Sequence, residues 1–402
     1  MLSLVEAQAI IAARVTTPVG AERVALDDCP GRVLANDLPA PRDVPGFVHS
    51  AMDGHAVRHA DVVAGEGTTL RCIGVVLAGS DAAFTPGAGE CVRIMTGAPL
   101  PPGTDTVVIK EHTRVEGERV TLTHAGPTPG GNVRSAHDDW RAGAIAIPAG
   151  TRLAAAQVGV LASFGMDVVT VRQRVRVAAI ATGDELIAPG TAWRNGMRYD
   201  SNGSVLAALV AAHGALLVDR QRVRDDRDAL REAVLRAARS ADVVLTTGGV
   251  SAGEADYLPG VVADIGETWF WKVAMRPGMP VLAGQVEGTP VFALPGNPVS
   301  VVATFCALVR PALARLSACP ALDPAPRMAR IAHDASKAHE RLELRRATLT
   351  VDDDGVRWVT LHASISSGAL RSVAESDVLV QLAPGQRQWQ AGDRVPTYPL
   401  QP

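Results

Sequence analysis

The chain has 402 residues, of which 47% are hydrophobic and 20% are charged, and its formal net charge is −3. This length predicts two to four domains, and this composition excludes a disordered chain. The charge argues against a protein that coats nucleic acid or binds an anionic membrane, so an anionic substrate must meet local positive charge.

The cysteines and the N-terminus indicate the compartment. Five cysteines are scattered without C-x-x-C spacing, Cys29, Cys72, Cys91, Cys306 and Cys319. Their odd number and spacing favour buried free thiols over a disulfide framework or a zinc site. The first 14 residues include Glu6 and lack a basic start, which is a poor signal peptide. Polar residues interrupt the apolar stretch 153–171, which favours a buried helix followed by a strand over a membrane span. We therefore expect a soluble, cytoplasmic protein.

The first part of the chain predicts two intertwined regions. Residues 3–15 carry apolar side chains at helical spacing and predict an amphipathic helix. Prolines cluster from 39 to 45 and mark a boundary. Between about 47 and 139, short β-like runs alternate with Gly/Pro turns and predict a small, mostly-β domain, the runs being 69–73, 90–95, 106–109 and 119–123. Residues 142–170 return to an Ala-rich helical pattern, which we expect to rejoin the N-terminal helix in one discontinuous domain.

The second part predicts an α/β unit and a small barrel. From 174 to about 318, strand and helix patterns alternate, which is typical of a doubly wound unit with mostly parallel strands. A Pro-rich linker follows at 320–326, and the tail predicts a small β-barrel of about 80 residues. The expected fold is therefore multidomain α/β plus β, with domains at 1–40 with 141–172, 41–140, 173–319 and 320–402.

Three apolar runs end in polar loops that contain glycine. Residues 242–245 lead into a Thr-Thr-Gly-Gly loop, 175–180 into Thr-Gly-Asp-Glu, and 291–294 into Pro-Gly-Asn-Pro, where Asn297 is a natural helix N-cap. In an open parallel sheet, ligands bind at the carboxyl ends of the strands, where glycines let backbone N–H groups approach an anion. Glycine after a strand is also ordinary turn chemistry, so one such loop is a weak signal. Because there are three, we expect them to converge on one anion-binding crevice.

Seven short segments, in order along the chain, resemble the molybdopterin molybdenumtransferase family, which includes the MoeA proteins and the E domain of gephyrin. They are SAMDG at 50–54, IMTGA at 94–98, TGDEL at 182–186, DSN at 200–202, GGVS at 248–251, GEADY at 253–257 and LPGNPVS at 294–300. The resemblance covers nearly the whole chain. It implies an enzyme of molybdenum cofactor biosynthesis that takes adenylylated molybdopterin and molybdate, inserts molybdenum into the dithiolene and releases AMP with the help of Mg²⁺.

The resemblance also implies partners. In the family, the loop that matches residues 50–54 faces the α/β domain of the other subunit, which implies a homodimer with a shared active site. The protein partners that this chemistry implies are the molybdopterin adenylyltransferase and the molybdoenzymes that receive the cofactor.

Five carboxylates are the candidate catalytic acids, Asp53, Asp139, Glu185, Asp225 and Asp256. Mg²⁺ prefers carboxylate and phosphate oxygens, and the candidate metal ligands are Asp256 and Glu185. From the residues alone, other roles stay open. Asp53 could simply open a turn before Gly54, Asp256 and Glu185 could be first-turn acids of helices, and either Asp225 or its neighbour is expected to be an N-cap. Comparison with the family segment favours Asp139 over the adjacent aspartate.

Lys272 and Arg276 complete the candidate catalytic set. The chain has three lysines, Lys110, Lys272 and Lys337, so a lysine within the candidate region stands out. The family pattern reads Lys-Pro-Gly-Lys-Pro after an upstream lysine. Lys272 matches the upstream lysine, whereas Arg276 and Met279 replace the later two. Arg276 can still meet an oxyanion, but Met279 cannot, so we expect the loss of one positive charge, with consequences for the rate and for the preference between molybdate and tungstate.

The remaining candidates bind the substrate or cofactor. They are Thr96, Arg134, Thr182, Gly183, Ser201, Asn202, Gly248, Gly249, Ser251, Gly253, Glu254, Pro277, Pro295, Gly296, Asn297, Pro298, Ser300, Arg346 and Ser367. Arg346 and Ser367 align with the arginine and serine that the family uses around molybdate. Thr96 could equally be a structural turn residue, and a lone exposed arginine such as Arg134 is usually surface.

Two other functions stay open from the sequence. A molybdopterin adenylyltransferase shares the same type of α/β domain, but that family is typically a single domain, whereas roughly 250 further residues surround it here. A non-catalytic paralogue that binds the cofactor or acts as a scaffold is favoured only by the lost charge at Met279.

Overall fold

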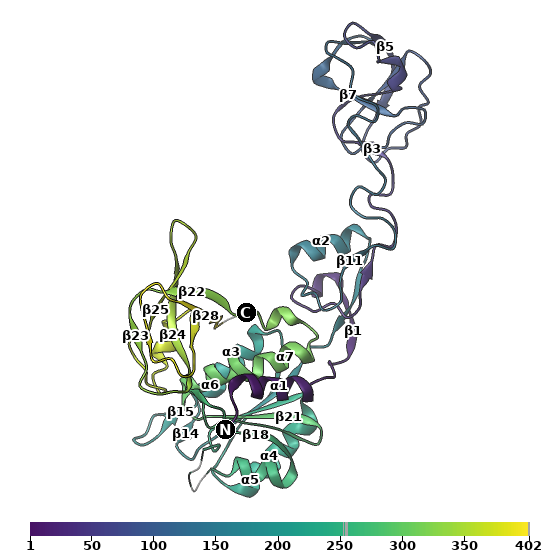
Figure 1. Ribbon diagram of the computed structural model, residues 1–402. Coiled ribbons are helices and arrows are strands. Elements are labelled where there is room, and N and C mark those ends of the chain that lie inside the picture. The colour runs from purple at the N-terminus through teal and green to yellow at the C-terminus, as the bar shows by residue number, and fades with distance from the viewer. Residues whose placement is uncertain (252, 254–255, 401–402) are drawn as a thin grey trace. The chain divides into compact units, whose positions relative to one another are not determined.

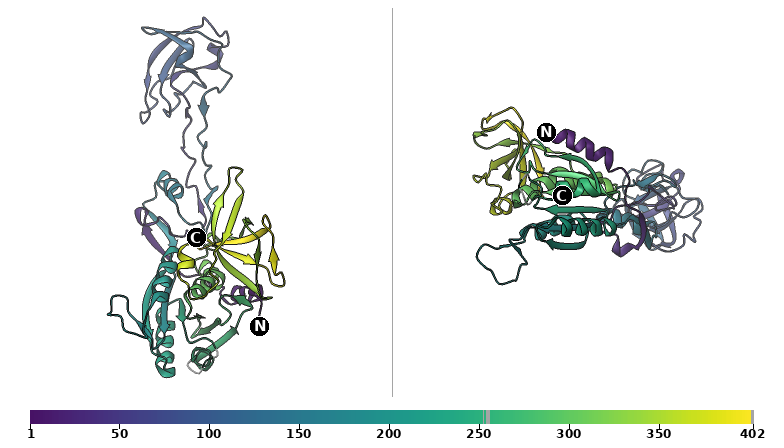
Figure 2. Two further views of the ribbon diagram at one scale, coloured as in Figure 1. Left: turned by 90° about the vertical axis from the view of Figure 1, so that its left-hand side faces the viewer. Right: turned by 90° about the horizontal axis from the view of Figure 1, so that it is seen from below.

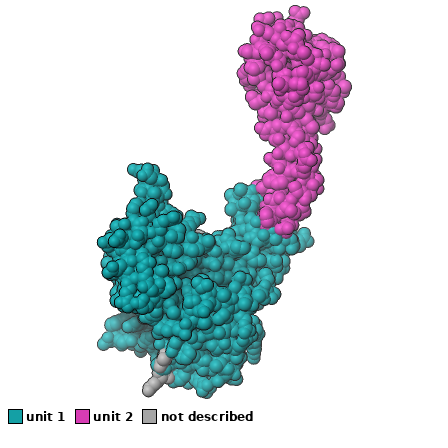
Figure 3. Space-filling model, viewed as in Figure 1, with its two compact units in different colours: residues 1–36, 149–158, 167–402 teal, residues 37–148, 159–166 magenta. Residues whose placement is uncertain are grey.

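The central sheet of this protein carries helices on both faces, and the same unit ends in a closed barrel (Figure 1). The computed structural model describes residues 1–251, 253 and 256–400. They form two compact units, the first made of residues 1–36, 149–158 and 167–402 and the second of residues 37–148 and 159–166 (Figure 3).

The sheet of the first unit has the strand order β16-β13-β17-β21-β20-β18. The first four strands are parallel: β16 Leu216–Val223, β13 Arg176–Thr182, β17 Val243–Thr247 and β21 Thr289–Leu294. Two antiparallel strands, β20 Leu282–Val286 and β18 Gly266–Trp271, extend one edge. The predicted doubly wound α/β unit is confirmed, and these two edge strands are additional to the predicted elements.

Alternating side chains of the buried strands build a core on each face of the sheet. The helices are α1 Leu4–Arg14, α3 Ser201–Ala212, α4 Arg227–Ser240, α5 Leu258–Ile265, α6 Pro298–Thr304 and α7 Arg310–Leu316, with a π-helical segment at Phe305–Val309. On β13, Val177 and Ala179 join the core shared with α1, α3, α6 and α7. Ala178 and Ile180 join the core shared with α4 and α5. Figure 1 shows the two helical layers on opposite faces of the sheet.

The predicted N-terminal helix is confirmed as α1. Ser3 and Glu6 form a capping box, because each side chain accepts a hydrogen bond from the other residue's backbone N–H. Leu4, Ala7 and Ile11 are buried in the first core, as expected from their spacing. Within the described residues, Pro298–Leu316 is the one helical stretch that is long and apolar enough for a membrane span, and 89% of its apolar window is buried inside the protein.

Segments that precede and follow the β-rich stretch of residues 41–140 pair with one another. In the first unit, β1 Ala21–Ala25 pairs antiparallel with β12 Val168–Arg172. In the second unit, β2 Leu38–Pro39 pairs with β11 Ile145–Ile147. The helix predicted before β12 is present as α2 Ala155–Ser163, but the expectation that it is buried is wrong, because only Leu161 is fully buried in this helix rich in alanine. The four-domain division stays a prediction.

The C-terminal region is the predicted small barrel. Five strands close on themselves in the order β24-β25-β22-β28-β26 and back to β24. Their bounds are β22 Arg327–Ile331, β24 Leu342–Val351, β25 Arg357–Leu361, β26 Val378–Leu382 and β28 Arg394–Pro399. Figure 2 shows the barrel in yellow beside the helices of the same unit. A short strand from the α/β region, β19 Met275–Arg276, pairs with β24 and joins the barrel to the sheet region.

Smaller elements complete the first unit. They are the pair β14 Leu186–Ile187 and β15 Arg198–Tyr199, the pair β23 Ala335–Ser336 and β27 Gln388–Trp389, and the single turn of helix α8 Arg371–Ala374.

The second unit is mostly β, as predicted. Its main sheet has the order β7-β4-β6-β5-β9-β8. The strands are β4 Gly54–Val57, β5 Thr69–Val76, β6 Glu90–Ile94, β7 Thr106–Ile109, β8 Thr113–Glu116 and β9 Arg119–Leu122, and a further pair joins β3 His49–Ser50 to β10 Val133–Arg134. All four predicted β-like runs are strands.

The expected buried thiols are also present, since four of the five free cysteines are buried and Cys72 is half-buried.

Candidate functional site

The three predicted strand ends lie side by side. β13, β17 and β21 are neighbours in the sheet, with Ala181 opposite Thr247 and Thr247 opposite Leu294. The Gly248 N–H donates to the Leu294 carbonyl over 3.1 Å, which ties the β17 loop to the end of β21. The prediction that these loops converge is therefore confirmed.

Gly248 allows the loops to approach closely. Its φ is +89°, a conformation that favours glycine. A Cβ atom at this position would lie 2.6 Å from the Thr182 carbonyl oxygen, which no side chain could tolerate without displacing the backbone. Gly249 also has a positive φ and lies against the Thr182 methyl group. The Gly-Gly pair therefore brings the backbone of β17 against the end of β13, beside Gly183.

The loop after β21 is held from two sides. Asn202, on α3 next to Ser201, donates its Nδ2 hydrogen to the Gly296 carbonyl over 2.8 Å. Asn297 occupies the N-cap position of α6 and Pro298 its first turn, as predicted. The Asn297 side chain does not cap the helix, however, because its Nδ2 donates to Ser367 Oγ over 2.9 Å. The sequence places Asn297 correctly but does not reveal this long-range partner.

Asp225 lies at the end of the neighbouring strand β16 and accepts a hydrogen bond from Thr182 Oγ1 over 2.6 Å. The N-cap of α4 is Asp226, whose carboxylate accepts from the Ala229 N–H over 2.8 Å. Asp226, and not Asp225, is therefore the N-cap of α4, and the Asp225 carboxylate lies beside the β13 loop.

Glu185 and Asp256 are not first-turn acids of helices. Glu185 lies in a turn before β14, with its carboxylate folded over Gly183. Asp256 precedes Tyr257, the N-cap of α5, and its Oδ2 accepts from the Gly253 N–H over 2.7 Å. Among the predicted residues nearby, Ser251 is exposed, and Glu254 lies outside the described residues.

A cavity of about 450 Å³ opens between the sheet region and the barrel, within the first unit. Seven predicted residues line it: Arg276, Pro277, Pro295, Asn297, Ser300, Arg346 and Ser367. The lining also includes three residues that the sequence did not single out as binding candidates, Met279, Arg341 and Glu343. The same loop, 295–297, thus borders the Gly248 backbone on one side and this cavity on the other.

The cavity is positively charged. Arg346 is 2% exposed, and its guanidinium donates to Ser372 Oγ over 3.0 Å and to the Ser364 carbonyl over 2.5 Å. Burial lowers the pKa of Arg346. The one carboxylate in the lining, Glu343, is engaged by Arg345 through three contacts of 2.9 to 3.1 Å. An incoming anion therefore meets arginine side chains whose nearest carboxylate is already neutralised.

Lys272 lies outside the lining of this cavity but close to the β17 loop. Its ammonium stands 4.2 Å from the centre of the Trp271 ring, a cation–π contact. The Trp271 Nε1–H donates to the Val250 carbonyl over 3.0 Å, so this pair of residues is fastened to the Gly-Gly loop. The structure thus brings Lys272 to the converging strand ends rather than to the cavity.

In the second unit, Asp53 and Thr96 are direct partners. Asp53 Oδ1 accepts from the Thr96 N–H over 2.9 Å and from Thr96 Oγ1 over 2.8 Å. Lys110 Nζ lies 3.3 Å from Asp53 Oδ2. The backbone N–H of Thr96, then its hydroxyl and then Lys110 lower the pKa of Asp53. Sequence reasoning noted Lys110 only for its rarity and missed its position beside Asp53.

Arg134 and Asp139 are not paired. Arg134 Nη1 lies 3.4 Å from Asp138 Oδ2, so the neighbouring aspartate is the ion-pair partner. Asp139 is exposed, and its backbone N–H donates to the Val44 carbonyl over 3.1 Å. Among the residues that the structure describes, no hydrogen bond or ion pair of the Asp139 carboxylate explains its match to the family.

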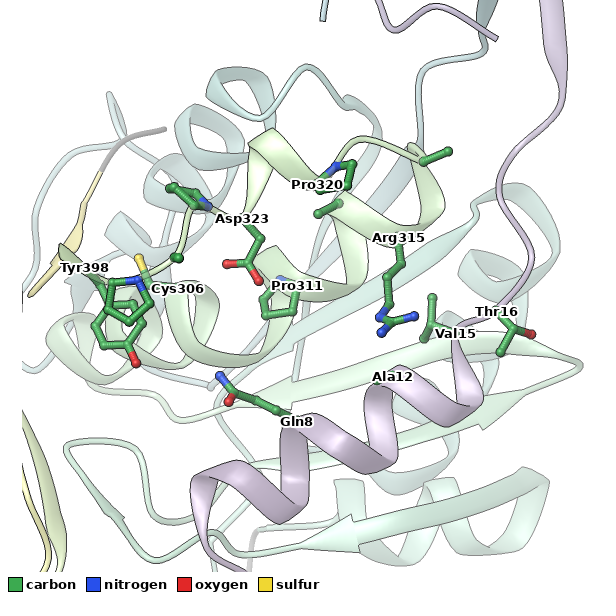
Figure 4. A pocket seen from close by; sticks show the side chains of 15 residues that line it. Gln8, Ala12, Val15, Thr16, Cys306, Pro311, Arg315, Pro320, Asp323 and Tyr398 are labelled. Atoms are coloured by element: carbon green, nitrogen blue, oxygen red, sulfur yellow. The ribbon is translucent and has the colours of Figure 1, made fainter. Parts of the chain in front are cut away.

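A second cavity, of about 640 Å³, lies beside α1 and contains none of the predicted site residues (Figure 4). Gln8, Asp323 and Tyr398 line it. Asp323 is the partner of the buried Arg310, with 3.1 Å between Nε and Oδ1, so this carboxylate already has a structural role. The predicted site residues line the cavity beside Arg346 instead.

Comparisons with known proteins match the whole length of the chain. Residues 2–165 match the MoeA N-terminal region (domain I and II), residues 178–315 a probable molybdopterin binding domain, and residues 328–400 the MoeA C-terminal region (domain IV). The molybdopterin molybdenumtransferase of Haemophilus influenzae is 31% identical over 401 residues, covering 100% of this chain and 99% of the relative. That of a Nostoc species is 39% identical over 71% of this chain and 67% of the relative.

Solved structures agree with these matches. The crystal structure of the molybdopterin biosynthesis MoeA protein from Pyrococcus horikosii superposes with a TM-score of 0.84 at 29% identity and covers both chains fully. A second structure of a MoeA protein from Pyrococcus horikoshii gives a TM-score of 0.86 at 25% identity, over 99% of this chain and 100% of that chain.

Proposed function

The chain belongs to the molybdopterin molybdenumtransferase family, transferases that insert molybdenum into molybdopterin in cofactor biosynthesis, and we propose that it uses adenylylated molybdopterin, molybdate and Mg²⁺ and releases AMP. The observation that supports this proposal most directly is the cavity where Arg276 and Ser300 meet Arg346 and Ser367. Guanidinium and hydroxyl groups are suitable donors for a tetrahedral oxyanion.

The converging strand ends are the proposed site for the nucleotide–pterin linkage. The Gly248 N–H is used by the Leu294 carbonyl, so the N–H groups that follow it in the Gly-Gly turn are the ones that we propose face phosphate oxygens, with the positive charge of Lys272 beside them. Because loop 295–297 borders both regions, phosphate and oxyanion would lie on its two sides. This arrangement would hold the pterin dithiolene next to the metal oxyanion, which is the positioning that insertion requires.

The donor set fits Mg²⁺. Asp256 and Glu185 offer carboxylate oxygens, and one oxygen of Asp256 is held by the Gly253 N–H. No group of three or more His, Cys, Asp or Glu side chains poised to hold a metal occurs among the residues that the structure describes. That suits a cation that keeps several waters and takes only one or two carboxylates together with substrate phosphates. When bound, Mg²⁺ neutralises phosphate charge as AMP leaves.

The second unit contributes the proposed catalytic carboxylate. Asp53 is ionised at neutral pH, as aspartates ordinarily are, and Thr96 and Lys110 lower its pKa further. We propose that this loop completes the active site of a second copy in a homodimer. We also propose a cytoplasmic enzyme that exchanges substrate and product with a molybdopterin adenylyltransferase and with recipient molybdoenzymes.

The test is AMP release from adenylylated molybdopterin by the purified full-length protein, with and without molybdate and Mg²⁺. We expect release only with both, and we expect Asp53→Asn to abolish it. Asp81→Asn, an exposed aspartate of the same unit, is the matched control and should leave the rate unchanged. Release of AMP without molybdate, or adenylylation of bare molybdopterin from ATP, would refute the proposed reaction. Normal turnover of Asp53→Asn would remove Asp53 from the site.

A further inference from the structure

Arg341 lines the oxyanion cavity without a carboxylate partner. It precedes β24, and its Nη1 lies 3.0 Å from the Met279 sulfur, a weak acceptor. Over residues 1–251, 253 and 256–400, no carboxylate lies within ion-pair distance of its guanidinium. Within the described part of the chain, the Met279 sulfur is the one acceptor of this guanidinium, so most of its five donors are free to bind an anion.

The backbone at Arg341 is held in place by a buried lysine. Lys337 is 6% exposed, and its ammonium donates to the Arg341 carbonyl over 2.6 Å and also to the Ala383 carbonyl. The neighbouring Glu340 carbonyl accepts from the Gly385 N–H over 2.9 Å. Burying an ammonium is costly unless its donors are satisfied, so the turn that carries Arg341 is a defined structure and not a loose surface loop.

Three arginines gather around the cavity. Arg276, Arg341 and Arg346 all line it, and the carboxylate of Glu343 is already bound by Arg345. Converging like charges repel one another, and the repulsion is relieved when an anion with two negative charges enters. The charge of the cavity therefore matches a divalent tetrahedral oxyanion.

We propose that Arg341 is a third oxyanion-binding arginine, and that it supplies the positive charge that Met279 cannot. This inference rests on the proposed function, because it assigns molybdate or tungstate as the anion in this cavity. The Arg341 guanidinium donates to the Met279 sulfur, and on binding it exchanges this weak acceptor for an oxyanion oxygen. The cation lost at position 279 is thus replaced from the barrel, 62 residues later in the chain.

The test measures oxyanion affinity directly. Titration calorimetry of the purified full-length protein with molybdate, and separately with tungstate, gives the Kd for each. We expect Arg341→Gln to raise both Kd values by about 10- to 100-fold, since a hydrogen bond from a charged donor to an anion is lost. Met279→Lys in the Arg341→Gln background should restore most of the affinity. Arg330→Gln, at an exposed barrel arginine whose guanidinium donates to the Gly392 carbonyl, is the control and should bind as wild type.

Two outcomes would overturn the inference. Wild-type affinity in Arg341→Gln would show that the guanidinium does not bind the anion. A loss that Met279→Lys fails to restore would show that Arg341 acts on the fold of the barrel, and near-ultraviolet circular dichroism of both variants would reveal that change. If AMP release depends on molybdate but Arg341→Gln binds it normally, this inference fails and the proposed function stands. If Arg341→Gln weakens oxyanion binding while no molybdate-dependent AMP release occurs, the proposed function fails and the binding role stands.

Discussion

Replacing Arg345 by glutamine should destabilise the barrel and the cavity together. Glu343 is buried, with its side chain 5% exposed, and Arg345 is 11% exposed. Their carboxylate and guanidinium make three contacts of 2.9 to 3.1 Å. Arg345→Gln leaves the carboxylate buried without this partner, next to the proposed anion site.

The magnitude follows from the burial of the pair. Breaking a buried ion pair by removing one partner costs roughly 3–5 kcal/mol. The expected value is about 4 kcal/mol, in the middle of this range, because His339 Nε2 lies 3.5 Å from Glu343 but burial lowers the pKa of His339, so this imidazole compensates little at neutral pH. Removing both charges in Glu343→Gln/Arg345→Gln should restore stability to within about 1 kcal/mol of wild type, because an uncharged buried pair carries no uncompensated ion.

The assay is urea unfolding followed by tryptophan fluorescence, alongside calorimetric titration with tungstate. Arg345→Gln should weaken tungstate binding, whereas Glu343→Gln should strengthen it, since the first leaves a negative charge in the cavity and the second removes one. The reasoning is refuted if Arg345→Gln loses less than about 1 kcal/mol, or if both single variants shift the tungstate Kd in the same direction.

Two further predictions concern the other predicted positions. Thr96→Val should raise the pKa of Asp53 in an NMR titration. The rise should be partial, because the Thr96 N–H, the largest cause of the lowered pKa, remains. The stability that this depressed pKa provides is present above the unfolded pKa of Asp53 and is lost as pH falls through the folded value. The free energies of unfolding of the variant and the wild type should therefore differ at neutral pH and converge in acid. A difference in stability that persists in acid would contradict this prediction. Gly248→Ala should lower the free energy of unfolding, measured with urea, by roughly 1–2 kcal/mol for the positive φ alone. The loss should be larger still, because the new Cβ would lie 2.6 Å from the Thr182 carbonyl oxygen. Gly260→Ala, within α5 and without such crowding, should instead stabilise by about 0.5–1 kcal/mol, and equal effects of both substitutions would contradict the argument.

Local patterns predicted much of the fold. The period of apolar residues identified α1 and the four parallel strands, because a half-buried helix and a doubly buried strand each impose a spacing on neighbouring residues. Glycines and prolines after the strands placed the ligand loops, including Asn297 at the start of α6. The two antiparallel strands β18 and β20 carry no comparable pattern: β18 is mostly exposed or half-buried, and β20, although buried, is five residues long and contains a glycine and a glutamine.

Partners distant in the chain could not be predicted in the same way. The sequence could not decide between Asp225 and Asp226 as N-cap, nor show that Lys110 stands beside Asp53. It predicted a missing positive charge at Met279, but Arg341 lies in another region of the chain and comes close to Met279 in a fold where β19 pairs with β24. Such contacts depend on tertiary structure, which no local spacing encodes.

The strand β19 has a consequence for how ligands exchange. Its backbone pairs with Leu342 and Glu343 of β24, so strand pairing joins one wall of the proposed oxyanion cavity to the other. Swinging the barrel away to admit an anion would sever those main-chain bonds. We therefore expect an anion to enter this cavity through rotamer changes of its long side chains, which take nanoseconds or less when the side chains are exposed, and not through slow opening of the whole barrel.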